Sequence, residues 1–307
     1  MQHYLLKETQ LYEVWREQKL NHYPKCANEL IIELNNPIKI TDNELKGLQA
    51  NCAKANITLY RCINNDQNNK QLVITLAQQL GLQQLDANVC SDEDCISVIQ
   101  DSGQDQNINN SKTHYIPYTN KALNWHTDGY YNSNQQRINA FLMHCVRPAK
   151  SCGENNYLDP EIAYILLRDE NPDYITALMH DDVMTIPTNE IDRTNIRAEQ
   201  TGPVFYIDKQ TQNLGMRFTA RKRNIVWKKD KMVQNALSFL HEILEGNPFV
   251  FRYNLKAGEG VICNNVLHNR SAFVDHEDEQ NKRMLYRARF YNRVASDQSS
   301  LQQAVSH

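Results

Sequence analysis

The chain has 307 residues, a length that suits one large domain or two small ones, and we expect a single catalytic domain over residues 1–307. Its formal net charge of −3 provides no basic surface of the kind that binds nucleic acid. No apolar run reaches membrane-spanning length and the first residues do not resemble a signal peptide, so we expect a cytoplasmic protein with no membrane partner. The eight cysteines are scattered without a Cys-x-x-Cys pair, which fits reduced thiols.

Residues 1–114 are expected to form a mixed α/β part that packs on the catalytic core. Thr41 and Glu44 have the spacing of a capping box, which predicts a helix through about residue 54. A strand over 57–63 and a second helix over 71–82 follow. The polar segment 102–111 predicts a loop, for which a lid and an ordinary connection are equally suitable interpretations.

Residues 115–294 are expected to form a catalytic barrel core with helical insertions, and residues 295–307 a flexible tail. Strands are predicted over 138–145, 204–207, 215–219, 249–255 and 283–291, and helices over 160–168, 172–179 and 229–244. Gly258 and Gly260 predict a hairpin after the strand 249–255. The pattern favours a mainly β fold with added helices, a double-stranded β-helix or jelly-roll barrel.

One residue separates His126 from Asp128, in a stretch that is expected to end a strand. Residues i and i+2 of a strand point to the same side, so both side chains could hold one metal ion while Thr127 faces away. His268, 140 positions after Asp128, is the candidate third ligand. Two imidazoles and one carboxylate can occupy one face of an iron octahedron and leave the other positions open. A His-x-Asp tripeptide alone is more often an ordinary histidine near an acid.

The segment 283–291 alternates like a strand and places Arg283, Arg287 and Arg289 on one face. Same-face neighbours lie only about 6.6 Å apart, so guanidinium groups there repel one another unless anions or acidic side chains lie between them. A small diacid would provide carboxylates for the planar two-pronged contact that arginine makes. The alternative is a solvated face of an edge strand.

Together these motifs resemble the iron(II)- and 2-oxoglutarate-dependent dioxygenases of the taurine dioxygenase-like superfamily, which includes γ-butyrobetaine hydroxylase and clavaminate synthase. The matching segments occur in the family's order at 125–128, 152–155, 258–262, 267–271 and 283–287. The resemblance implies that His126, Asp128 and His268 bind Fe(II). It also implies that 2-oxoglutarate and dioxygen (O2) are co-substrates, and that decarboxylation to succinate and carbon dioxide supplies the oxidant.

The resemblance further assigns roles to polar residues near the metal motifs. Arg283, 15 positions after His268, takes the place of the arginine that binds the far carboxylate of 2-oxoglutarate. Arg287 matches the arginine that anchors the substrate's acidic group in several relatives, although it stays open as the 2-oxoglutarate ligand instead. Asn155 matches the residue that lies against the co-substrate.

The implied reaction is hydroxylation of an unactivated carbon, with desaturation or ring closure left open. Halogenating relatives replace the carboxylate ligand with a small residue, whereas this chain retains Asp128. The expected substrate is a small polar molecule with a carboxylate or similar anion, such as an amino acid or a betaine-like compound. Tyr118, Asn120 and Tyr130 flank the metal motif and are candidate substrate residues, since tyrosine rings can receive a cationic ammonium.

Three further residues have competing interpretations. Arg217 and Arg221 resemble part of a substrate-proximal strand in the γ-butyrobetaine hydroxylase branch, but nearby acids could pair with them instead. His144 is expected to be a core histidine rather than a ligand.

Two other functions stay open, namely a metal-binding barrel that acts as a sensor or scaffold without turnover, and a zinc-dependent hydrolase. A homo-oligomer is also left open.

Overall fold

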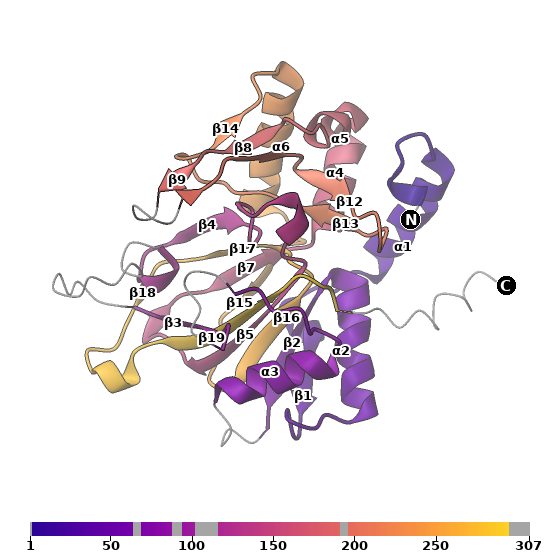
Figure 1. Cartoon of the computed structure of the whole chain (residues 1–307). Helices are drawn as coiled ribbons and strands as arrows, with labels where there is room; N and C mark the ends of the chain where they lie inside the picture. The colour runs from indigo at the N-terminus through magenta and orange to yellow at the C-terminus, as the bar shows by residue number, and fades with distance from the viewer. Residues whose placement is uncertain (1, 64–68, 88–93, 102–115, 191–195, 295–307) are drawn as a thin grey trace.

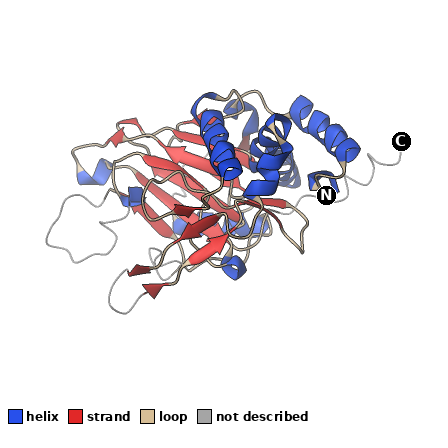
Figure 2. Ribbon diagram, turned by 90° about the horizontal axis from the view of Figure 1, so that it is seen from above, coloured by secondary structure: helices blue, strands red, loops and turns tan. Residues whose placement is uncertain are grey.

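The computed structural model describes residues 2–63, 69–87, 94–101, 116–190 and 196–294. The predicted loop over 102–111 and the predicted tail over 295–307 lie outside these ranges. The described part is mixed α/β with several sheets, and Figure 2 shows strands at the centre with most helices grouped at one end. Within these ranges no helix combines the length and apolar character needed to span a membrane. The seven cysteines in the described ranges are all free thiols.

The largest sheet has six strands in the order β1-β2-β16-β5-β19-β3. In that order the strands are Ile31–Leu34, Ile57–Cys62, Glu259–Cys263, Ala140–Arg147, Met284–Phe290 and Ser97–Gln100. Strands β1 and β2 are parallel, and the other neighbouring pairs are antiparallel. Strands from the N-terminal third therefore pair directly with later strands in one sheet (Figure 1).

Two helices from the N-terminal third, α2 (Asp42–Ala55) and α3 (Lys70–Gln79), cover one face of this sheet (Figure 1). The predicted capping box is confirmed: the Thr41 side chain accepts from the Glu44 backbone N–H, and the Glu44 carboxylate accepts from that of Thr41. Strand β5 shows how the sheet divides the core. Ala140 and Leu142 pack toward these helices, whereas Phe141 points to the opposite side.

A second sheet of four antiparallel strands lies against that opposite side, in the order β15-β7-β17-β4. These strands are Phe251–Tyr253, Asn155–Leu158, Leu267–Arg270 and Leu123–His126. The ring centroids of Phe141 and His268 are 4.8 Å apart, so the inner faces of the two sheets contact each other. Within the described ranges the two sheets are not joined by strand pairing into a closed barrel.

The predicted hairpin at Gly258 and Gly260 is wrong. Strand β15 belongs to the four-stranded sheet and β16 to the six-stranded sheet, so the turn carries the chain from one sheet to the other. Gly258 has a φ of +80°, which favours glycine. A Cβ on Gly260 would lie 2.3 Å from the Tyr60 ring, so this glycine is needed for close packing against β2 rather than for a hairpin.

The remaining elements lie at the periphery and at the other end of the molecule (Figure 1). The helices are α1 (Thr9–His22), α4 (Pro160–Glu170), α5 (Pro172–Leu178) and α6 (Lys231–Gly246). The short strands are β6 (Ser151–Cys152), β8 (Met184–Ile186), β9 (Asn189–Glu190), β10 (Ile196–Arg197), β11 (Gln200–Gly202), β12 (Phe205–Ile207), β13 (Leu214–Met216), β14 (Val226–Trp227) and β18 (Phe273–Val274). Asp159 and Asn171 cap α4 and α5 as predicted.

Candidate metal centre and substrate cavity

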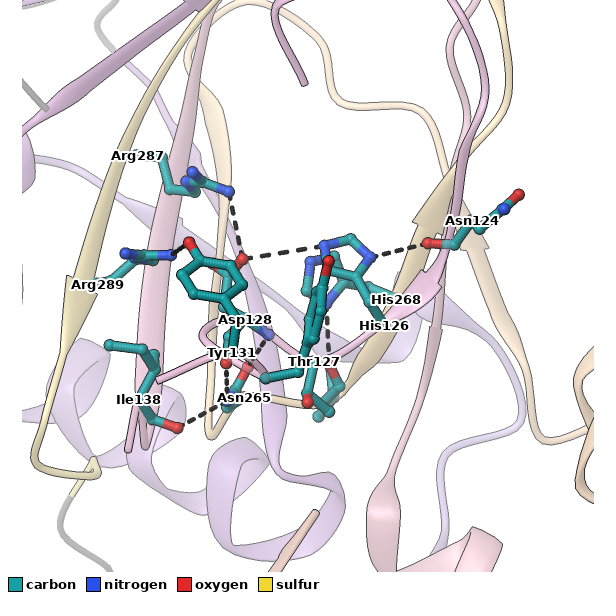
Figure 3. Close-up of polar contacts among 12 residues, drawn as sticks. Asn124, His126, Thr127, Asp128, Tyr131, Ile138, Asn265, His268, Arg287 and Arg289 are labelled. Carbon is teal, nitrogen blue, oxygen red and sulfur yellow. Dashed lines mark hydrogen bonds and ion pairs between the residues drawn. The ribbon is translucent and has the colours of Figure 1, made fainter. Parts of the chain in front are cut away.

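The structure brings His126, Asp128 and His268 together between the two sheets. One ligand atom from each of the three side chains can be chosen so that all three atoms lie within 4.8 Å of one another. His126 ends β4 and lies directly opposite His268 in β17, which places their ring centroids 4.2 Å apart. Nε2 of His126 lies 3.9 Å from Oδ1 of Asp128 (Figure 3). All three side chains are buried.

The two imidazoles are held so that Nε2 is free of a proton. Nδ1 of His126 lies 2.8 Å from the backbone oxygen of Asn124, and Nδ1 of His268 lies 2.9 Å from that of Val266. A carbonyl oxygen can only accept, so each Nδ1 must carry the proton. Burial lowers the pKa of both rings, that of His126 to about 3, and keeps them neutral. Both Nε2 lone pairs are therefore available to a metal ion.

Asp128 is held in its ionised form. Burial alone would raise its pKa, but the positive charges of Arg287 and Arg289 more than offset that effect and lower the pKa below its usual value. Oδ1 of Asp128 lies 3.3 Å from Nη1 of Arg287, whereas Oδ2 is buried and has no hydrogen-bond partner among the described residues. A buried anionic oxygen without a partner, beside two unprotonated imidazole nitrogens, fits a divalent cation such as Fe(II).

Two features fix the chain within the His126–Asp128 motif and directly after it. The Thr127 backbone pairs with Phe218, since its N–H donates to the Phe218 oxygen at 3.0 Å and its hydroxyl accepts from the Phe218 N–H at 3.1 Å. Thr127 therefore faces away from the cluster, as predicted. Gly129 then reverses the chain with a φ of +67°, and a Cβ there would lie 2.5 Å from the Ile138 side chain.

Asn265, which no sequence motif indicates, holds the backbone of Asp128 in place. Its side-chain oxygen accepts from the Asp128 backbone N–H at 2.8 Å, and its amide nitrogen donates to the backbone oxygens of Asp128 and Ile138 (Figure 3). Two consecutive asparagines before a strand are a turn signal, and Asn265 has a φ of +50°. Nothing local in the sequence shows that its side chain reaches back 137 positions to Asp128.

Arg283 lies just before β19 and is 5% exposed. Its guanidinium carbon is 5.0 Å from the centre of the Phe273 ring, and that of Arg270 is 4.9 Å from the same ring. Arg270 donates to three backbone oxygens, at Pro117, Thr119 and Lys121. By contrast, no described residue accepts a hydrogen bond from the Arg283 guanidinium. Its burial lowers the pKa to about 10, which still leaves it cationic at neutral pH.

A further polar group without a partner among the described residues lies beside the metal cluster. Tyr157 lies directly opposite His268 in the neighbouring strand, and its buried hydroxyl has no hydrogen-bond partner within the described ranges. The guanidinium of Arg283 acts electrostatically on this hydroxyl. Asn155 is buried two positions earlier in β7, on the same face, whereas Asn156 lies on the other face and donates to Asn269. Asn155, one of the two predicted co-substrate residues, thus shares the inner face of the four-stranded sheet with His268.

Arg287 and Arg289 follow on the same face of β19. Arg287 contacts Asp128, whereas Arg289 forms a buried ion pair with Asp86 and donates to the Tyr131 hydroxyl at 2.9 Å (Figure 3). The predicted arginine face is therefore internal, and the alternative of a solvated edge face is wrong. Asp86 is not identifiable from the sequence because it is 203 positions away from Arg289 and belongs to no motif.

A cavity of about 670 Å³ opens beside the cluster. His126, Asp128 and Arg287 form part of its lining, and so do two of the predicted substrate residues, Tyr118 and Tyr130. Asn120 is not among the lining residues: its side chain is exposed and its backbone oxygen accepts from Phe273. Arg283 and Asn155 do not line the cavity either.

The structure gives different surroundings to Arg217, Arg221 and His144, the three residues with competing interpretations. Arg217 donates to four backbone oxygens, at Tyr130, Met184, Gly202 and Gln200, and so binds chain segments together rather than acids or a ligand. Arg221 lines the cavity and donates to the Tyr130 hydroxyl at 2.8 Å. His144 is fully buried, and its Nδ1 is 2.9 Å from the Tyr60 hydroxyl, which confirms a core histidine.

Three solved structures that resemble this chain are oxygenases. One is an asparagine oxygenase in complex with Fe(II), (2S,3S)-3-hydroxyasparagine and succinate, with 14% identity over 85% of this chain and 81% of the other, and a TM-score of 0.57. A taurine dioxygenase from Burkholderia xenovorans has 14% identity over 87% and 89%, with a TM-score of 0.57. The non-heme iron oxygenase OrfP, in complex with Fe, succinate and (3S)-hydroxy-L-Arg, has 15% identity over 85% and 86%, with a TM-score of 0.58.

At these identities the likeness shows a shared fold. A comparison with curated protein sequences gave no match. The family model of the taurine catabolism dioxygenase TauD, TfdA family, however, matches residues 68–289, well over half of the chain and all the residues of the metal cluster. The chain therefore belongs to this family, and it is an Fe(II)- and 2-oxoglutarate-dependent dioxygenase.

Proposed function

We propose that this dioxygenase hydroxylates an unactivated carbon of a small polar substrate that carries a carboxylate or a similar anion. The observation that carries the proposal is the cluster of His126, Asp128 and His268, with two unprotonated Nε2 atoms and one unpartnered carboxylate oxygen, at the wall of a cavity. These three residues would hold Fe(II), which, when bound, activates dioxygen at the expense of 2-oxoglutarate.

We assign the far carboxylate of 2-oxoglutarate to Arg283 and a supporting contact to Asn155. A buried guanidinium without an acceptor, next to the unpartnered hydroxyl of Tyr157, supports an anionic ligand between Arg283 and His268. Such groups are costly to bury unless a ligand completes their hydrogen bonds. A diacid whose other end reaches the metal cluster would do so, because Tyr157 lies next to His268 in the sheet.

We assign the acidic group of the substrate to Arg287. This side chain lines the cavity and lies 3.3 Å from Asp128, so an anion bound to it would place the rest of the substrate beside the metal. Its Nε is buried without a partner among the described residues. Tyr118 and Tyr130 would form the adjoining walls. The chain would thus orient the reacting carbon and keep bulk water away from it.

Hydroxylated amino acids with succinate occupy two of the similar structures, 3-hydroxyasparagine in one and 3-hydroxyarginine in the other. These complexes support an amino acid or a related molecule as the substrate class here. Because the chain retains Asp128, we expect hydroxylation rather than halogenation. Membership of the dioxygenase family disfavours the sensor and zinc-hydrolase interpretations.

We also propose that the two large sheets are the halves of a double-stranded β-helix. The turn at Gly258 carries the chain from one sheet to the other, and the side chains of Phe141 and His268 meet between them. In such a barrel the metal lies at the mouth, between the two halves.

The test is a product analysis under ¹⁸O₂. The protein is supplied with Fe(II), 2-oxoglutarate and a panel of amino acids and betaine-like compounds, and succinate and product masses are measured together. We expect one compound to release succinate stoichiometrically and to gain one labelled oxygen atom. A product that has lost two hydrogens without gaining oxygen would identify a desaturase, and conversion that needs neither 2-oxoglutarate nor dioxygen would overturn the proposal.

A further inference from the structure

Two adjacent tyrosines that line the cavity each contact an arginine side chain. The rings of Tyr130 and Tyr131 meet edge to face, with their centroids 5.1 Å apart. Arg221 donates to the Tyr130 hydroxyl at 2.8 Å, and its guanidinium carbon is 5.7 Å from the ring centre. The guanidinium carbon of Arg197 lies 5.0 Å from the centre of the Tyr131 ring. These four residues, which we call the tyrosine–arginine wall, all line the cavity.

Among the residues that the structure describes, the charges lining the cavity do not balance. These lining residues include four arginines, at 197, 221, 287 and 289, but only two acids, Asp86 and Asp128. Asp86 forms the buried ion pair with Arg289, and Asp128 belongs to the proposed metal ligands and contacts Arg287. Among the described residues, no carboxylate lies within ion-pair distance of Arg197 or Arg221. Within the described part of the chain, the tyrosine–arginine wall therefore has two positive charges without acidic partners.

One of these guanidinium groups also has an unused donor inside the protein. Nε of Arg197 is buried and has no hydrogen-bond partner among the described residues, and the same is true of Nε of Arg287. A buried donor without an acceptor costs free energy unless a ligand provides one. The unpartnered donors occur on Arg287, beside the metal cluster, and on Arg197, at the tyrosine–arginine wall. Each position suits the two-pronged contact between a guanidinium and an anion.

We propose that the substrate has two anionic groups, one bound by Arg287 and the second bound by Arg197 and Arg221 at the tyrosine–arginine wall. This inference rests on the proposed function and narrows its substrate class. The cavity of about 670 Å³ is as large as pockets that bind drug-sized ligands, typically roughly 300–1,000 Å³, so it has room for a molecule that reaches both positions. A carboxylate or a phosphate would serve equally as the second group.

The test is an anaerobic titration of the Fe(II)–2-oxoglutarate complex with matched compounds, followed by the shift of the visible charge-transfer band. One arm compares N-acetyl-L-glutamate with N-acetyl-L-glutamine and L-glutamate with L-glutamine, and the other compares O-phospho-L-serine with L-serine. In at least one arm we expect the compound with the second anionic group to bind about tenfold or more tightly than its partner, since one charge-assisted contact contributes that much.

The variants Arg197→Gln and Arg221→Gln should each remove most of this preference. Arg223→Gln is the matched control, because Arg223 is an exposed arginine in the same segment as Arg221 and does not line the cavity. Equal affinities within every pair, including the absence of binding by any compound, would overturn the inference, as would a preference that survives in both cavity variants. If the band does not form before any compound is added, the proposed function has failed instead.

Discussion

At His126 and His268, one backbone carbonyl per ring selects the tautomer that a metal ion needs. Each Nδ1 donates to a carbonyl only two residues earlier in the chain, so both Nε2 atoms face the Asp128 carboxylate without protons. Asn265 positions that carboxylate through its backbone, and Arg287 and Arg289 keep it ionised. The cluster is therefore preorganised by hydrogen bonds that do not involve the metal itself.

Substitutions of Arg283 and Arg287 should have different effects on the steady-state kinetics. Arg283→Ala removes the only cation proposed for the far carboxylate of 2-oxoglutarate and should raise the KM for 2-oxoglutarate by roughly 10- to 100-fold, as expected for lost hydrogen bonds to a charged group. Arg287→Ala should leave that KM nearly unchanged and release succinate without a matching amount of hydroxylated product. Steady-state assays of both products check this, and the reverse pattern would exchange the two assignments.

The titration of His144 should contribute to the loss of stability of the fold in acid. Its burial lowers the pKa to about 4, from an ordinary value of 6.5. The unfolded chain therefore binds more protons than the folded one between these pH values, so stability falls as the pH decreases from about 6.5 to about 4. The full effect is about 3 kcal/mol. Denaturant unfolding across this range should show a shallower pH dependence in His144→Gln, and an unchanged slope would contradict the assignment.

The sequence predicts the candidate metal ligands and the arginines near them better than the residues that hold these side chains in place. His126 and Asp128 are identifiable because their spacing follows from strand geometry, and Arg283 and Arg287 because they alternate along a strand. Asn265 and Asp86 lie 137 and 203 positions from their partners, and their roles depend on how the two sheets are brought together. No local pattern contains that information.

At the scale of the element, β19 shows what the alternation of apolar and charged side chains along a strand can predict. Its Tyr286, Ala288 and Phe290 pack toward α2 and α3, while Leu285 and the two arginines point between the sheets. The alternation was predictable, and the repulsion between neighbouring guanidinium groups indicated anionic partners, but no pattern in the sequence identified Asp128 and Asp86 as those partners. The ionic contacts with Asp128 and Asp86 make the burial of these arginines tolerable.

The start of β16 leads to an element-scale prediction. Gly260→Ala places a Cβ 2.3 Å from the Tyr60 ring, which is stacked on His144 in the core and cannot easily move. We expect this variant to destabilise the fold by about 1–3 kcal/mol through overpacking. Gly246→Ala, at the end of α6 with nothing within 4 Å of its added Cβ, is the control and should be neutral or slightly stabilising. Equal midpoints of denaturant unfolding for the two variants would contradict the conclusion that Gly260 is needed for close packing against Tyr60.

For the whole molecule, the N-terminal third is part of the scaffold. Strands β1, β2 and β3 pair in one sheet with β16 and β19, and α2 and α3 cover that sheet (Figure 1). The sequence predicted an α/β part that packs on a barrel, because its strands and helices were identifiable but their pairing partners were not. The helices after β7 were predictable from their caps, whereas the short strands beside them lack a distinctive pattern.

The central claim is that His126, Asp128 and His268 form one metal site on which 2-oxoglutarate binds. The most direct measurement is an anaerobic titration of the metal-free protein with Fe(II) and 2-oxoglutarate, followed by the visible charge-transfer band of the chelate. The band should form in the natural protein and in His180→Ala, a control at an exposed histidine paired with Asp182, and should be lost in Asp128→Ala and His126→Ala. A band that persists in the last two variants, or its absence in the natural protein despite bound iron, would contradict the claim.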